Sequence, residues 1–278
     1  MTDGMLMRYS AFSSTSSGGN PAGVWIGNVL PSKEEMQAIA CQVGFSETAF
    51  IAPASGSIRD VRYFSPEIEI DFCGHATIAS GIALGEISGP GTYTFSTLVG
   101  KIPVLVSKDG LLMYAALTSV QPRTGEASRE LVENILNALG WHFSDLDPSI
   151  PPRKAYAGVW HLVLAVKRFE RLNTLEYDFD ALKLIMEDNE LTTLQLVWRE
   201  SDSDFHSRNP FPVGGVVEDP ATGAAAAALG GYLREKGFVQ PPVRLLIHQG
   251  EAMGRPSEIT VDIPKTGGIV VSGTATKL

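Results

Sequence analysis

"VVEDPATGAAAAALGGYL" at 216–233 and "EIDFCGHATIASGIAL" at 69–84 decide the fold that we expect for this chain. In each stretch an acidic segment leads through a glycine-containing turn into a run of small residues. The turn glycines, Gly74 and Gly223, lie about half a chain length apart, which suggests a duplication. A helix of alanine and glycine has little side-chain bulk, so strands can approach it from all sides. We therefore predict that each run is a helix at the centre of a domain and wrapped by a sheet.

Composition limits the classes of protein to which the chain can belong. The sequence has 278 residues, of which 44% are hydrophobic and 19% charged, with a net charge of −9 and two cysteines. The negative charge argues against nonspecific binding to nucleic acid or anionic membranes. No stretch approaches the roughly 20 apolar residues of a membrane span, and no signal peptide is recognisable. The two cysteines suit a reducing compartment, so we expect a cytoplasmic protein with a small-molecule partner.

Strands and helices alternate along the rest of the chain. We predict helices at 32–44, 128–140 and 178–188, the first with Ser32 and Glu35 as a capping box. Strands are predicted at 45–51, 58–65, 67–72, 158–166, 193–198, 243–250, 258–263 and 268–275, with several more within 93–117.

The order of these elements predicts an α+β fold with two pseudo-symmetric domains, each a curled mixed sheet around a central helix. Residues 118–128 form the best linker, so we place the domains at 1–118 and 119–264. The C-terminal strand within 265–278 is a candidate to return to the first domain.

The two helix starts are candidate ligand sites. A helix N-terminus presents unpaired N–H groups and the positive end of its dipole, and a glycine there lets a ligand approach. Gly74 and Gly223 could thus help to clamp one carboxylate or phosphate. The alternative, that both turns simply cap buried helices, stays open.

Glu47 is a candidate general acid or base. In the strand 45–51 it points with Phe45, Ala49 and Ile51, the more apolar face. Burial disfavours the charged form of a carboxyl group, and a group that can change its charge near neutral pH suits acid–base catalysis. The alternative is an edge strand with Glu47 in water.

The residues at the helix starts suggest further roles. His75 should be neutral and able to exchange a proton, because a helix N-terminus disfavours a protonated ring. Asp219 suits an N-cap or a loop carboxylate, and Glu218 a solvated or structural position.

Thiol and metal chemistry are not expected. Cys73 lies at a helix start, where a thiolate is favoured, but only two residues from His75, which we take as poor geometry for a dyad. Cys41 is expected in the core. No P-loop or dinucleotide fingerprint is present. The remaining histidines show no ligand spacing, so no metal site is predicted; they are His142, His161, His206 and His248.

Five motifs in order carry a family resemblance. They are "GGNPAGV" at 18–24, "SETAF" at 46–50, "FCGHAT" at 72–77, "EDPATG" at 218–223 and "QGEAMGRPSEI" at 249–259. Together they resemble the PhzF-like family of phenazine-biosynthesis isomerases, which has the diaminopimelate-epimerase fold. The resemblance runs nearly end to end.

The resemblance implies a cofactor-free enzyme, commonly a homodimer, with its active site in the cleft between the domains. In the type member, a dihydro-hydroxyanthranilate is isomerised by a proton shift. By resemblance the catalytic residues are Glu47, His75 and Asp219. By resemblance, the residues that bind the substrate are Ser46, Gly74, His75, Gly223 and Ala224.

Two departures bear on the substrate and the mechanism. Ala224 stands where the type member has a serine, so one hydroxyl of the expected substrate site is missing. Cys73 resembles the first catalytic cysteine of diaminopimelate epimerase, but the opposite motif offers Pro220 and no thiol. We therefore predict a Glu47-dependent isomerase that moves a proton on a small carboxylate-bearing molecule. A non-catalytic ligand-binding or protein-interaction member of the fold, or an amino-acid racemase or epimerase, stays open.

Overall fold

A computed structural model describes residues 3–278 of the chain, which fold into two compact units. Among the described residues, the first comprises 3–118 and Ser272–Leu278, and the second comprises Ser119–Val271. The chain thus re-enters the first unit at Ser272, and residues 265–271 belong to the second. That the active site lies between the units stays a prediction from the sequence. No helix in the described part of the chain is long and apolar enough to cross a membrane.

The described part of the first unit contains two helices. They are α1 (Lys33–Val43) and α2 (Gly74–Ser88). Its strands are β1 (Gly4–Ala11), β2 (Asn20–Gly27), β3 (Glu47–Ser55), β4 (Ile58–Phe64), β5 (Glu69–Ile70), β6 (Gly91–Thr97), β7 (Gly100–Asp109), β8 (Leu112–Thr118) and β18 (Ala275–Lys277).

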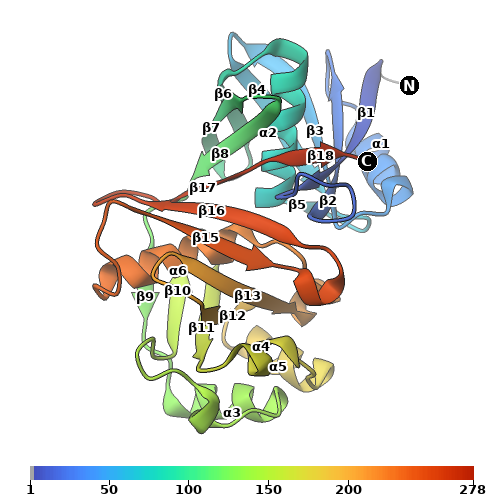
Figure 1. Cartoon of the computed structure of the whole chain (residues 1–278). Helices are drawn as coiled ribbons and strands as arrows, with labels where there is room; N and C mark the ends of the chain where they lie inside the picture. The colour runs from blue at the N-terminus through green and yellow to red at the C-terminus, as the bar shows by residue number, and fades with distance from the viewer. Residues whose placement is uncertain (1–2) are drawn as a thin grey trace. The chain divides into compact units, whose positions relative to one another are not determined.

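The sheet of the first unit curls around α2 (Figure 1). Its strand order is β18-β1-β2-β3-β4-β6-β7-β8, with the β2–β3 and β4–β6 pairs parallel and the other pairs antiparallel. Helix α2 touches strands from both ends of this order, β1, β2 and β18 as well as β7 and β8. Every residue from His75 to Gly85 is buried. The absence of bulk explains the fit: a Cβ at Gly81 would come within 2.9 Å of side-chain atoms of Ala115 and Val104.

The second unit has four helices and three short 3-10 turns. The helices are α3 (Arg129–Ala138), α4 (Phe169–Asn173), α5 (Phe179–Asp188) and α6 (Gly223–Glu235), and the turns are η1 (Phe143–Asp145), η2 (Pro212–Gly214) and η3 (Glu251–Met253). Its strands are β9 (Arg123–Gly125), β10 (Arg153–Tyr156), β11 (Trp160–Val166), β12 (Thr193–Arg199), β13 (Asp204–Phe211), β14 (Val216–Asp219), β15 (Val243–Gln249) and β16 (Ser257–Ile263). Strand β17 (Val270–Gly273) spans the unit boundary.

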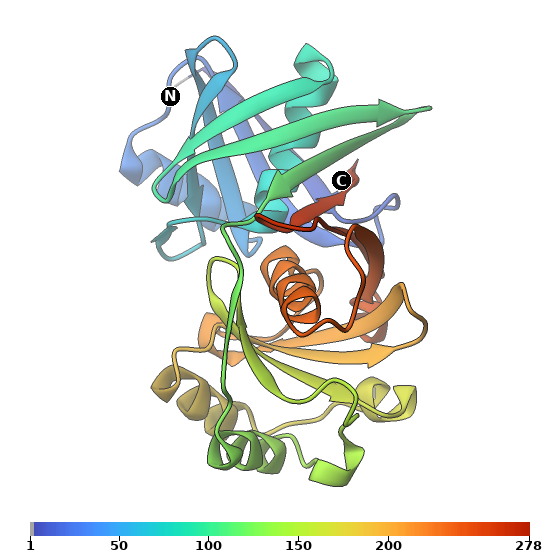
Figure 2. The same ribbon diagram turned by 90° about the vertical axis from the view of Figure 1, so that its left-hand side faces the viewer.

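In the second unit α6 takes the place that α2 has in the first. The strand order is β9-β10-β11-β12-β13-β15-β16, with β11–β12 and β13–β15 parallel. Helix α6 touches strands from β9 to β16, while α3, α4 and α5 lie on the other face of the sheet (Figure 2). On that outer face, leucines of β11 and β12 pack against α3 and α5 in an apolar core.

The two units share one connection pattern. In each unit, a β-hairpin is followed by one or two helices and by a strand that pairs parallel with the second hairpin strand. An antiparallel strand, a short strand and the small-residue helix come next. The strand after that helix pairs parallel with the antiparallel strand. The corresponding strands are β2, β3, β4 and β6 in the first unit and β11, β12, β13 and β15 in the second. The predicted fold class, two similar α+β units with curled mixed sheets around central helices, is confirmed.

Several local predictions need correction. The alternating segment 67–72 forms only the two-residue β5, and Ile68 is 62% exposed, so its alternation does not mark a buried face. The predicted linker 118–128 contains the short β9, which pairs with β10. Cys41 is exposed, because the buried stripe of α1 consists of Met36, Ala40 and Val43.

Candidate active site

Glu47 is the first residue of β3, where it lies opposite Ala22 of the parallel strand β2. Its side chain is only 17% exposed. The residues that follow it, from Thr48 to Ile51, are fully buried on both faces of the strand. The strand is therefore internal, as expected for an acid–base group, and the open-edge alternative for Glu47 is wrong.

His75, in the first turn of α2, has different neighbours at its two ring nitrogens. Its Nδ1 is 3.2 Å from the amide nitrogen of Asn20 and 3.3 Å from the sulfur of Cys73. Its Nε2 is 3.2 Å from Oε2 of Glu47 and 3.5 Å from Oγ of Ser46. An amide nitrogen can only donate, so Nδ1 accepts and the proton of a neutral ring resides on Nε2. The ring thus presents an N–H on the side of Glu47.

The Glu47 carboxylate is not fully satisfied by this neighbour. Although Oε2 lies within ion-pair distance of His75, the geometry is not that of a hydrogen bond. Oε2 is buried and has no hydrogen-bond partner among residues 3–278. A buried acceptor without a partner is costly, and such atoms are typical of sites that await a ligand or proton.

The prediction of poor geometry between Cys73 and His75 is wrong. Cys73 is the N-cap residue of α2 with an extended backbone, which brings its sulfur to 3.3 Å from Nδ1. Within residues 3–278, Glu47, Cys73 and His75 also form the group whose potential metal-ligand atoms lie within 4.8 Å of one another. Since the single lone pair of Nδ1 already accepts from Asn20, it is not free to bind a metal, and the absence of a resident metal stays a prediction.

The two central helices begin differently from α1, α3 and α5. The side chains of Ser32, Ser128 and Asp178 cap α1, α3 and α5 by accepting backbone N–H groups. The N-cap residues of α2 and α6, Cys73 and Thr222, provide no such bond. First-turn amides without a side-chain cap, next to glycine, are a typical binding site for an anion.

Asp219 ends β14 and belongs to the turn before α6. It is not the N-cap. Its Oδ2 instead accepts a 2.6 Å hydrogen bond from Oγ1 of Thr222. The Gln249 side chain binds the same turn, with its Nε2 2.7 Å from the Asp219 carbonyl and 3.0 Å from Oγ1 of Thr222. Asp219 is therefore a loop carboxylate held in a defined position.

Glu218 has a structural role, but it is not solvated. Its side chain is 4% exposed and accepts two hydrogen bonds from Arg208, at 3.0 and 2.5 Å. The pair joins β14 to β13 beside the Asp219 turn.

The positions of the helix starts also correct which residue of the second motif corresponds to Cys73 of the first. Cys73 and Thr222 are both N-cap residues that precede the first helical glycine. The counterpart of Cys73 is therefore Thr222 and not Pro220. The conclusion about a second thiol is unchanged, because Cys41 is the only other cysteine of the sequence.

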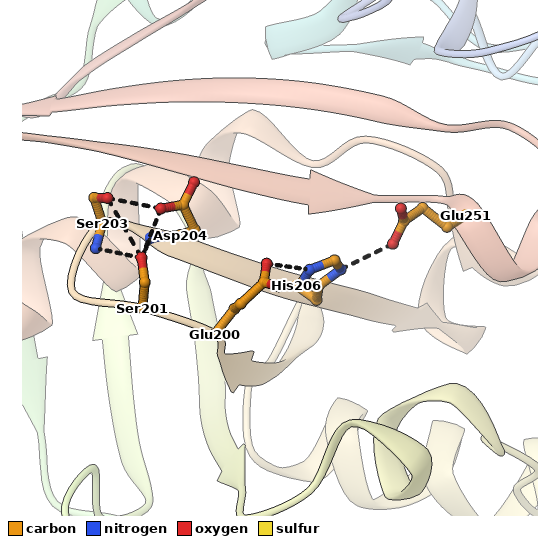
Figure 3. A network of polar contacts seen from close by, with 6 residues as sticks. All are labelled: Glu200, Ser201, Ser203, Asp204, His206 and Glu251. Atoms are coloured by element: carbon orange, nitrogen blue, oxygen red, sulfur yellow. Dashed lines mark hydrogen bonds and ion pairs between the residues drawn. The ribbon is translucent and has the colours of Figure 1, made fainter.

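A separate polar cluster lies on the second unit (Figure 3). His206 sits between two carboxylates, with Nδ1 2.9 Å from Glu251 and Nε2 3.1 Å from Glu200. Nearby, hydrogen bonds from Ser201 and then Ser203 lower the pKa of Asp204. This cluster contains none of the residues predicted for catalysis. The contact between Glu251 and His206 connects η3 to β13.

The structure therefore brings together Glu47, His75 and Ser46 in the first unit, with Gly74 at the same helix start. Asp219 lies in the turn before Gly223 and Ala224 in the second unit. Sequence reasoning missed Asn20 and Gln249 as members of these groups. Both lie in segments that the sequence analysis quoted, 18–24 and 249–259, but neither carries a charge that would have drawn attention to it.

Comparisons with known proteins agree with the resemblance. The family model "Phenazine biosynthesis-like protein" (PhzC-PhzF) matches residues 9–278. A Bacillus subtilis protein, "Uncharacterized isomerase YfhB", is 31% identical over 289 residues that cover 99% of this chain and 97% of that protein.

Solved structures share the fold. A "Predicted Epimerase" from Pseudomonas aeruginosa matches with a TM-score of 0.87 at 23% identity, covering 99% of this chain and 97% of that one. A PhzF-family protein from Bacillus anthracis matches with a TM-score of 0.86 at 24% identity, covering 100% of this chain and 98% of that one.

The isomerase names of the relatives favour an enzyme over a non-catalytic member of the fold. Because the family model spans nearly the whole sequence, the chain belongs to the phenazine biosynthesis-like PhzF family, and it is an isomerase.

Proposed function

We propose that the protein moves a proton between carbon positions of a small carboxylate-bearing molecule, with Glu47 as the general acid and base and with no cofactor. The observation that carries this proposal is the buried Oε2 of Glu47, which lies 3.2 Å from His75 and has no hydrogen-bond partner within residues 3–278. A base that must receive a proton needs an acceptor atom that is not already occupied.

The chemistry is balanced without an external reagent. Glu47 takes a proton from a carbon beside an unsaturated or carbonyl group, and the C–H electron pair moves into the conjugated system. The carboxylic acid so formed returns the proton to another carbon, which gives an isomer. Returned to the opposite face of the same carbon, the proton would instead give an epimer. General acid–base assistance of this kind contributes about 10²- to 10⁴-fold in rate.

The neighbours of Glu47 support the charge changes. Nε2 of His75 lies 3.2 Å from Oε2 of Glu47 without hydrogen-bond geometry between them, so its N–H can donate to an oxygen of the substrate on which negative charge develops. We propose that the first-turn amides of α2 and α6, at Gly74, His75, Gly223 and Ala224, bind the substrate carboxylate, since neither helix has a side-chain cap. Asp219, held by Thr222, would accept a hydrogen bond from a polar substituent of the same substrate.

Ala224 bears on the substrate class. Its backbone N–H remains available for an anion, but it lacks the hydroxyl that the type member has there. We therefore propose an amino- or hydroxy-substituted carboxylate that differs from the phenazine precursor. A cytoplasmic location and a homodimeric state remain parts of this proposal.

Proton exchange in D₂O tests the proposed function. The protein is incubated with dihydro-hydroxyanthranilate and a panel of amino and hydroxy carboxylates, and exchange at carbon is followed by NMR. We expect exchange or isomerisation with at least one compound. The rate should fall at least 10²-fold in Glu47→Gln and stay unchanged in Glu67→Gln, whose side chain is exposed. Full activity of Glu47→Gln would overturn the assignment.

The same experiment tests the racemase alternative. The thiol of Cys73, 3.3 Å from His75, is a second group in the site that could exchange a proton. A racemase would incorporate deuterium at the α-carbon of an amino acid and produce both enantiomers, whereas the proposed isomerase would move a double bond.

A further inference from the structure

The segment at the end of β15 has no part in the function proposed so far. It contains Gln249, which is 1% exposed, and Gly250, which has a positive φ of 75°. Both residues lie against the Asp219 turn, and their contacts there are of different kinds.

Gln249 binds the turn through both ends of its amide. Its Oε1 accepts the backbone N–H of Thr222 at 3.2 Å. Its Nε2 donates to the carbonyl of Asp219 at 2.7 Å and to Oγ1 of Thr222 at 3.0 Å. Three hydrogen bonds from one side chain thus hold both ends of the turn.

The direction of these bonds is fixed by chemistry. A backbone N–H can only donate and a backbone carbonyl can only accept, so the amide of Gln249 has one permitted orientation. Because Oγ1 of Thr222 accepts from Gln249, its own proton is directed to Oδ2 of Asp219, 2.6 Å away. Gln249 therefore fixes the hydroxyl that in turn fixes the carboxylate of Asp219.

Gly250 allows its segment to pack closely against the Asp219 turn. A Cβ at this position would stand 2.7 Å from the carbonyl oxygen of Pro220 and 2.3 Å from that of Arg255. Any larger residue would push this segment away from the turn, and the positive φ adds strain for a residue other than glycine.

Gln249 is itself held by β13. Ser207 lies opposite Gln249 in the parallel β13–β15 ladder, and its Oγ donates to Oε1 of Gln249 at 3.2 Å. Two residues on, Glu251 is bound by His206 of the same strand (Figure 3). The segment 249–251 is thus fastened to a central strand of the sheet on both sides of Gly250.

We propose that Gln249 and Gly250 are positioning residues for Asp219. They hold the turn before α6 in a fixed position against the sheet. This inference rests on the proposed function, in which Asp219 contacts the substrate. A shift of about 1 Å in a positioned group can cost about 10²-fold in rate. Gln249 itself would touch neither the substrate nor the reacting atoms.

The test compares Gln249→Met with Gln195→Met in the full chain. Gln195 is a matched control, because it is a fully buried amide of the same sheet whose hydrogen bond runs to Asn209 and not to the turn. Amide hydrogen exchange, which needs no substrate, should be at least 10-fold faster at Thr222 in Gln249→Met and unchanged there in Gln195→Met.

Kinetics on the folded variants then distinguish positioning from stability. Gln249→Met should lower kcat about 10²-fold with a smaller change in KM, and Gln195→Met should leave both close to wild type. Gln249→Glu should keep part of the activity at low pH, where a protonated carboxyl still donates and accepts. It should lose that activity as the pH rises and the carboxylate repels the carbonyl of Asp219.

Each outcome separates this proposal from the function on which it rests. Unchanged exchange at Thr222 in Gln249→Met would overturn the positioning role. Faster exchange with wild-type kcat, while Glu47→Gln is inactive, would also overturn it and leave the proposed function intact. Full activity of Glu47→Gln would overturn the proposed function, while hydrogen exchange would still report whether Gln249 holds the turn.

Discussion

Glu47 and Thr193 occupy the same place in the two units, and their surroundings differ. Each is the first residue of the second strand in the first parallel pair of its unit, Glu47 opposite Ala22 and Thr193 opposite His161. Thr193 has its hydroxyl oxygen bonded to His161 at 2.8 Å and to Asn209 at 3.2 Å. Oε2 of Glu47 has no hydrogen-bond partner in the described chain.

The helix starts repeat this contrast. At α2 three groups that can change their protonation, Glu47, Cys73 and His75, gather within 4.8 Å. At α6 the carboxylate of Asp219 is held by a hydroxyl, which an amide holds in turn. The duplicated fold therefore supplies two equivalent positions, one with groups that can move protons and one with groups that are fixed.

The largest expected effect is on the free energy of unfolding, and it concerns Glu218, the acid beside Asp219. Because Glu218 and Arg208 form a buried pair, Glu218→Gln should lower the free energy of unfolding by about 3 kcal/mol or more, since the Arg208 charge loses its counter-ion. The kinetic constants of the folded protein should change little. Urea denaturation measures the first quantity and initial rates the second.

The control for this prediction is Asp262→Asn. Its partner Arg244 is 71% exposed, and such surface pairs contribute less than about 1 kcal/mol. If Glu218→Gln were no more destabilising than this control, the structural assignment of Glu218 would be wrong.

A smaller effect should appear in the pH dependence of stability. Burial lowers the pKa of His161 from 6.5 to about 3, with a weaker opposing contribution from its hydrogen bond to Thr193. Below pH 6.5 the unfolded chain binds a proton that the folded chain does not. The contribution of His161 to stability is therefore present above pH 6.5 and is lost as the pH falls toward 3, by up to about 1.4 kcal/mol per pH unit.

Thermal unfolding between pH 7 and pH 4 checks this prediction. His161→Gln should flatten the acid limb of the stability curve, while His142→Gln, at an exposed position, should leave it unchanged. An unaltered slope in His161→Gln would show that the buried ring does not titrate as described.

The smallest effect is expected for Cys73→Ser. The serine hydroxyl can replace the thiol beside Nδ1 of His75, so kcat/KM should fall less than about 10-fold. A loss beyond about 10³-fold, with the folded state intact, would instead indicate a chemical role for the thiol and would favour the epimerase alternative.

The fold could be predicted from the sequence because small-residue helices leave a strong compositional signal. The capping box of α1 is confirmed because it is a local pattern of residues. The prediction of a strand over 67–72 was wrong in its length, because alternation alone does not place a strand in a sheet. Only two residues of this segment pair with β4.

The candidate site was only partly predictable. Glu47, His75 and Asp219 carry charges or rings that attract attention, the first on a strand and the other two near helix starts. Asn20 and Gln249 are neutral amides whose importance depends on side-chain contacts over 55 and 27 residues of sequence. Such contacts are created by the pairing of distant strands and have no local pattern.

The most direct test of the difference between the two helix starts is the rate of deuterium incorporation at the substrate carbon for Glu47→Gln and Asp219→Asn, measured side by side by NMR. We predict that Glu47→Gln loses incorporation at least 10²-fold, because the base is gone. Asp219→Asn should slow incorporation by no more than about 10²-fold, because the substrate is less well positioned but the base is still present. Persistent exchange in Glu47→Gln, together with its loss in Asp219→Asn, would contradict this account and place the proton transfer in the second unit.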